Sequence, residues 1–139
     1  MTPHRRIAAV IVGLIVAAAF VEGAEAIVHR MHPFPPGIDE HNMAAIKKFV
    51  ATLPMSALLL VLAGWLLATI VGTFTTAKIA RSRVPAYVLG ALLLCAGIAN
   101  SVMIPQPLWF SIASFVIYIG GTWAGGRWGA AGASTIRAA

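Results

Sequence analysis

Four long apolar runs constrain the fold of this chain more than any other feature of its sequence. They span Ile7–Val28, Leu53–Phe74, Val84–Ile104 and Leu108–Ala124. Each is close to the ~20 residues that a helix needs to cross the ~30 Å hydrocarbon core of a bilayer. None alternates apolar and polar residues as a membrane strand does, and a helix satisfies its own backbone hydrogen bonds in lipid. The sequence therefore predicts an all-α polytopic membrane protein, a single transmembrane domain of residues 1–139 with four transmembrane helices in an up-down bundle.

The composition supports the lipid bilayer as the main partner. Hydrophobic residues make up 60% of the chain and charged residues 10%, whereas roughly a quarter of the residues of a soluble domain are charged. The net charge of +6 would suit nucleic acid, but the basic residues lie at the ends of the apolar runs and form no patch with aromatic residues between them. We therefore expect no nucleic-acid partner.

The basic residues also predict the orientation of the helices. One side of the membrane has seven of them, and the other side has three. The first set is Arg5, Arg6, Lys78, Arg81, Arg83, Arg127 and Arg137, and the second is Arg30, Lys47 and Lys48. The positive-inside rule then places both termini in the cytoplasm, with a cytoplasmic loop at 75–83 and a cytoplasmic tail at 125–139. The loop 29–52 faces outward.

The first apolar run also resembles a secretory signal peptide. Arg5 and Arg6 precede it, and Ala24-Glu25-Ala26 imitates a cleavage site. We expect the segment to be retained, because the uninterrupted run Ile7–Val21 is at the long limit for the apolar region of a signal peptide. Cleavage is the alternative, and it would leave the orientation of the other three helices unchanged.

The outward loop combines a helix stop with a second helix start. The run His32-Pro33-Phe34-Pro35-Pro36-Gly37 cannot continue a helix, so the first helix ends by about His32. Asp39 is predicted to be the N-cap of a short amphipathic segment, His41–Val50. We expect this segment to lie along the outer membrane surface as an interfacial helix.

A cluster of acids and histidines lies at the outer end of the first helix. Glu22, Glu25, His29 and His32 fall within one narrow helical sector at about 100° per residue. A carboxylate in a bilayer is costly and suggests a functional site. Other polar side chains on the remaining helices lie at comparable depth, namely Ser56, Asn100, Ser111, Ser114 and Tyr118. We expect them to meet the two glutamates in one polar pocket that opens outward, because unpaired polar groups are costly in hydrocarbon.

Three interpretations of this cluster remain open, and we favour the first. In a structural or accessory bundle, Glu25 pairs with Arg30 or a histidine, and Glu22 hydrogen-bonds to Asn100 or a serine. In the second interpretation the cluster binds a divalent metal such as zinc, iron or manganese. Its ligands would come from Glu22, Glu25, His29, His32 and His41. In the third, the acids carry a proton or small cation in an oligomeric transporter. The sequence contains no catalytic motif, so we do not expect an enzyme.

Small residues on the second and third helices predict close helix packing. Gly64, Ala68 and Gly72 are spaced four apart, and Gly90 and Gly97 lie a heptad apart. Such spacing lets helix backbones approach each other in lipid. We expect these contacts to lie within the bundle, with a homo-oligomer or a larger membrane complex as the alternative.

Several short segments resemble one family of membrane proteins. They are PFPPGID at 33–39, F49-x-x-x-LP-x-x-A57, G64-x7-G72 with Ala77, and M103-IP-x-P-x-W109. This pattern is similar to a family of small bacterial inner-membrane proteins with four transmembrane helices and no established activity. The resemblance implies the same fold and a bacterial inner (plasma) membrane location, and it implies no chemistry.

Overall fold

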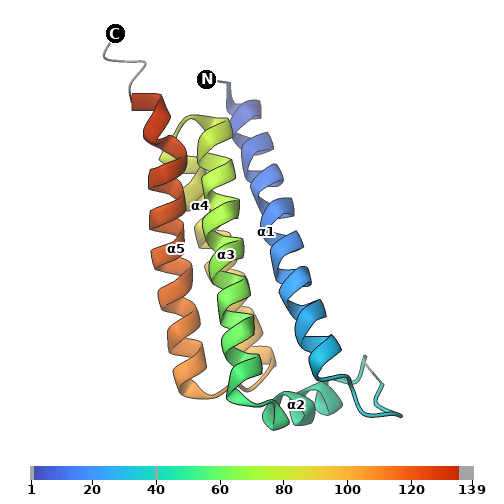
Figure 1. The fold of residues 1–139 in the computed structure, drawn as a ribbon. Helices are drawn as coiled ribbons and strands as arrows, with labels where there is room; N and C mark the ends of the chain where they lie inside the picture. The colour runs from blue at the N-terminus through green and yellow to red at the C-terminus, as the bar shows by residue number, and fades with distance from the viewer. Residues whose placement is uncertain (1, 40, 135–139) are drawn as a thin grey trace.

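The computed structural model describes residues 2–39 and 41–134 and contains five helices. They are α1 (Pro3–Met31), α2 (Met43–Thr52), α3 (Met55–Ala80), α4 (Arg83–Met103) and α5 (Leu108–Ser134). The four long helices run up and down beside one another, and α2 lies across one end of them (Figure 1). The described residues contain no strand. The predicted all-α fold with a short helix in the first loop is therefore confirmed.

Helices α1, α3, α4 and α5 are each long and apolar enough to cross a membrane, which fits a multi-pass membrane protein. Helices α1, α3 and α5 are longer than the apolar runs predicted, whereas α4 has the same length as its run. Helix α3 continues to Ala80, so the predicted loop 75–83 is reduced to a turn at Arg81 and Ser82. Helix α5 likewise continues through much of the predicted tail. Hydropathy marks only the part of a helix that lies in lipid, whereas backbone hydrogen bonding continues beyond the boundary.

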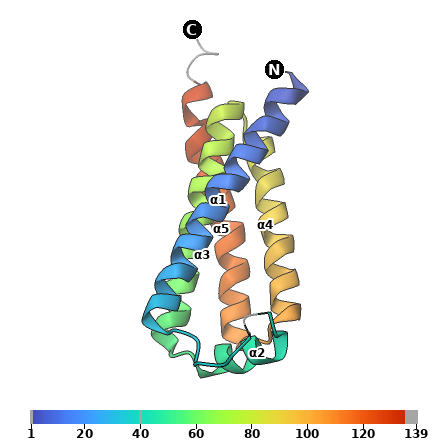
Figure 2. The same cartoon turned by 90° about the vertical axis from the view of Figure 1, so that its right-hand side faces the viewer.

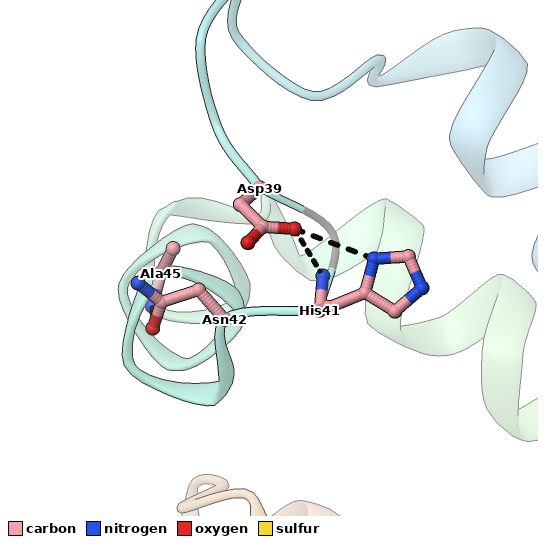
Figure 3. A network of polar contacts seen from close by, with 4 residues as sticks. All are labelled: Asp39, His41, Asn42 and Ala45. Carbon is pink, nitrogen blue, oxygen red and sulfur yellow. Dashed lines mark hydrogen bonds and ion pairs between the residues drawn. The ribbon is translucent and has the colours of Figure 1, made fainter.

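Helix α2 begins later than predicted and has a different N-cap. The side-chain oxygen of Asn42 accepts hydrogen bonds from the backbone N–H of Ala44 at 3.0 Å and of Ala45 at 3.4 Å. Asp39 instead accepts from the backbone N–H of His41 at 2.9 Å and lies 3.3 Å from its ring nitrogen Nδ1 (Figure 3). The prediction of Asp39 as the cap was therefore wrong, because its carboxylate stabilises the turn that precedes the helix.

Helix α3 is the centre of the bundle and packs against α1, α4 and α5. Its contact with α1 is made by small residues. A methyl group placed on Gly64 would collide with the Ala24 side chain, and one on Gly72 would lie 2.9 Å from both the Ala17 methyl and the Gly13 carbonyl oxygen. The row of small residues Gly64, Ala68 and Gly72, of which Ala68 is buried, therefore brings α3 close to α1 within a single chain.

The two glycines of α4 serve the contact with α5. A methyl group on Gly90 would collide with Thr122, and one on Gly97 would collide with the ring of Tyr118. Helix α1 also packs against α4, where a methyl group on Gly13 would lie 2.8 Å from Leu89. The small residues thus allow close contacts between α3 and α1, between α4 and α5, and between α1 and α4.

Candidate functional site

A cavity of about 520 Å³ lies at the α2 end of the bundle, and we call it the chamber. Its polar side chains are Glu22, Glu25 and His29 of α1, Asn100 of α4, and Gln106 of the turn between α4 and α5. Most of its other walls are aliphatic or aromatic. Among the described residues that line it, none is Lys or Arg. Either glutamate therefore makes the chamber negative whenever it is ionised.

The two glutamates lie on consecutive turns of α1, about 4.5 Å apart along the helix axis. Glu25 lies about 28 Å along α1 from Arg6, at ~1.5 Å per residue. When Arg6 stands at one face of the membrane, Glu25 is close to the opposite face and Glu22 is one turn deeper. Both side chains line the chamber and are also exposed at the surface of the bundle.

Helix α2 covers the end of the chamber. Ile46, Phe49 and Val50 share one face of this helix and line the cavity. The ring of Phe34 lies 4.4 Å from that of Phe49 and 5.2 Å from that of His29, measured between ring centroids. This row of rings connects the end of α1 to α2 through the proline-rich loop.

Aromatic side chains close the deep end of the chamber. The Trp65 ring meets the Phe110 ring edge-on at 5.5 Å and stacks against Tyr118 at 5.9 Å. Beyond them, Thr69 and Thr73 are fully buried, and their hydroxyls donate to the carbonyls of Trp65 and Thr69 at 2.8 and 2.6 Å. Both hydroxyls are therefore already hydrogen-bonded within α3.

Gln106 is a site residue that the sequence reasoning missed. Its side-chain oxygen Oε1 is buried and has no hydrogen-bond partner among the residues that the structure describes, although the residue lines the chamber. The available signal was its position as the polar residue between Pro105 and Pro107.

The structure brings together only part of the predicted polar pocket. Glu22, Glu25 and Asn100 line the chamber, whereas Ser56, Ser111, Ser114 and Tyr118 are not among its lining residues. Ser56 is exposed, and Ser114 is fully buried and donates to the Ser111 carbonyl at 2.8 Å. Tyr118 lies behind Trp65. Depth predicts the level of a side chain along the bundle, but the rotation of each helix decides which way it points.

The structure does not assemble the predicted metal site. Glu22, Glu25 and His29 line the chamber, but His32 does not, and His41 is exposed beside Asp39. Within residues 2–39 and 41–134, no three His, Cys, Asp or Glu side chains are grouped so that they could hold a metal ion. The described residues also show no ion pair between Glu25 and Arg30, since five positions on a helix place them about 140° apart.

Comparison of this sequence with known proteins finds no matching family model, no matching curated protein and no matching solved structure. The resemblance to the family of small bacterial inner-membrane proteins therefore stays a prediction.

Proposed function

We propose that this protein is a membrane-embedded binding protein whose chamber holds a small organic ligand with a positively charged amine. The observation that carries the proposal is the pair Glu22 and Glu25 on one wall of an otherwise largely apolar cavity of about 520 Å³. Small-molecule sites typically measure roughly 300–1,000 Å³ and have mainly apolar walls with few polar groups. The chamber has this size and this lining.

The charge of the lining favours a cation. A carboxylate that is partly removed from water is costly unless it is paired, and the chamber offers Glu22 and Glu25 no lysine or arginine among its described lining residues. The two carboxylates also repel each other when both are ionised, because they are one helical turn apart. An ammonium group bound between them removes both costs.

The remaining walls favour an organic amine over a bare metal ion. Calcium and magnesium require about six or more oxygen ligands around the ion, whereas the chamber is lined by few polar groups and by several aromatic rings. An ammonium group is attracted to the faces of rings such as Trp65 and Phe49.

Binding of an amine explains the chamber better than the structural and the transport interpretations of the sequence. A purely structural bundle does not require a cavity of this size lined by two acids. Transport by one copy requires a path past Trp65, Phe110 and Tyr118, and the buried threonines behind them are bonded to their own helix. An oligomeric proton or cation transporter is therefore the second candidate.

We further propose that the protein lies in the bacterial inner membrane with both termini in the cytoplasm. The excess of basic residues at the α3–α4 turn and near the two termini supports this orientation. In that orientation the chamber lies at the outer face of the membrane, where α2 covers it.

The proposal is tested by calorimetric titration of the purified protein in nanodiscs with 2-phenylethylamine and its neutral counterpart, 2-phenylethanol. We expect saturable binding of the amine and none of the alcohol. Glu25→Gln and Glu22→Gln should each lower the amine affinity by about tenfold, the equivalent of ~1.4 kcal/mol. Asp39→Asn, which removes a carboxylate outside the chamber, is the matched control and should bind like the wild type.

Circular dichroism and thermal unfolding of each variant separate a lost site from a lost fold. Equal binding of amine and alcohol would overturn the proposal. So would wild-type affinity in a folded Glu22→Gln/Glu25→Gln double variant.

A further inference from the structure

We infer that the ligand is an amphiphilic amine dissolved in the membrane, whose ammonium group lies at Glu22 and Glu25 and whose hydrocarbon chain passes between α1 and α4 into the surrounding lipid. This inference rests on the proposed function and adds the class of ligand. It follows from where the chamber is covered and where it is open.

The end of the chamber is covered. Phe49 and Val50 of α2, Phe34 of the loop and Gln106 of the α4–α5 turn all line it from this side. The contact between the tilted rings of Phe34 and Phe49 connects the loop to α2. A ligand that entered from water along the bundle axis would have to displace this cover.

The flank of the chamber is open at the level of the bilayer. Glu22, Glu25 and Ala26 line the cavity and are also exposed at the bundle surface. Helices α1 and α4 touch near Gly13 and Leu89 and then diverge toward α2 (Figure 2). At ~1.5 Å per residue, Glu22 lies about 24 Å from Arg6 along α1, so this opening faces hydrocarbon and its boundary rather than bulk water.

The order of polar and apolar groups along this opening matches the order of groups in an amphiphile. Glu25 is close to the membrane face, Glu22 is one turn deeper, and the exposed Ala26 leaves room at the rim. An amine with a long alkyl chain already keeps its charge at the headgroup boundary and its chain in hydrocarbon. It can therefore reach both carboxylates without leaving the membrane.

A side opening allows a ligand larger than the chamber to bind, because the excess chain remains in lipid. A closed cavity would exclude such a ligand. We propose titrating the protein in nanodiscs with n-alkylamines from hexylamine to hexadecylamine and with didodecylamine, whose two chains together exceed the chamber volume. Specific binding is the part of the titration signal that is lost in the double variant Glu22→Gln/Glu25→Gln. We expect the affinity, expressed relative to the amine free in water, to rise by about three- to fourfold per methylene of the alkyl chain. Didodecylamine should bind as well.

Narrowing the opening should restore a size limit. In Ala26→Trp, the affinity ratio of didodecylamine to 2-phenylethylamine should fall by at least about tenfold, with Ala26→Leu as a milder variant if the tryptophan disturbs folding. Ala63→Trp is the matched control, because Ala63 is an exposed alanine of α3 that is not among the lining residues. It should leave the ratio unchanged.

The outcomes separate the two proposals. Glutamate-dependent binding of 2-phenylethylamine without binding of didodecylamine would overturn this inference and leave the proposed function standing. If none of the amines bound to the protein, the proposed function itself would be overturned. Disulfide cross-linking of Ala26→Cys between two copies, in a Cys95→Ala background, would show that a second copy covers the opening and would also overturn the inference.

Discussion

The hydroxyl oxygen of Thr76 on α3 lies 3.2 Å from the carbonyl oxygen of Ala9 on α1, 67 positions earlier in the chain. The same hydroxyl is 2.9 Å from the carbonyl of Gly72, one turn earlier in its own helix. A methyl group on Gly13 would collide with this hydroxyl and would lie 2.7 Å from the Gly72 carbonyl oxygen. The hydrogen bond between the helices therefore depends on the missing side chain of Gly13.

Thr76→Val should destabilise the bundle, because valine has nearly the shape of threonine but cannot donate to Ala9. We expect a loss of about 0.5–1.5 kcal/mol in the free energy of unfolding, measured by denaturant titration in mixed micelles. Thr76→Ser retains the hydroxyl and should keep most of the stability. A larger loss in the serine variant than in the valine variant would show that the methyl group, and not the hydrogen bond, matters at this site.

Gly72→Ala should separate α1 from α3, because its new methyl group would lie 2.9 Å from both Ala17 and the Gly13 carbonyl oxygen. We expect destabilisation of about 1–3 kcal/mol, as for other overpacked sites. The same substitution at Gly120, where nothing lies within 4 Å, should stabilise the helix by up to about 1 kcal/mol. Equal melting temperatures of the two variants would contradict the close contact of α1 and α3.

Gln106→Met should separate stability from binding. Methionine is similar in size and removes a buried oxygen that has no partner among the described residues, so thermal stability should stay the same or rise by up to about 1 kcal/mol. Binding of 2-phenylethylamine should change by less than about twofold, because the buried Oε1 atom does not face the ligand. A loss of binding of about tenfold would contradict this expectation and show that Gln106 contacts the ligand.

Cysteine labelling tests the orientation, in a Cys95→Ala background because Cys95 is exposed. A cysteine at His41, whose side chain is 96% exposed, should react with an impermeant thiol reagent in intact cells. A cysteine at the exposed Thr2 should react only after the membrane is permeabilised. Labelling of the Thr2 variant alone would reverse the topology and place the chamber at the cytoplasmic face.

The fold class could be read from the sequence because it depends on local properties. Apolar runs long enough to cross a bilayer allow few structures other than helices, and Pro33, Pro35 and Pro36 end the first helix wherever the rest of the chain lies. The position of the N-cap of α2 could not be read in this way. Asp39 and Asn42 are both good caps, and the conformation of the turn decided between them.

The candidate site likewise has features that the sequence predicted and features that depended on the tertiary structure. The sequence by itself determined the levels of Glu22, Glu25 and Asn100, because helix rise converts position in the chain into depth. Only the tertiary structure decided which side chains share the chamber. Glycines such as Gly121 and Gly125 turn one face of α5 toward α3, and Ser114 and Tyr118 are buried without lining the chamber. Helix α2 and Gln106 complete the chamber through contacts between distant segments, which no local pattern encodes.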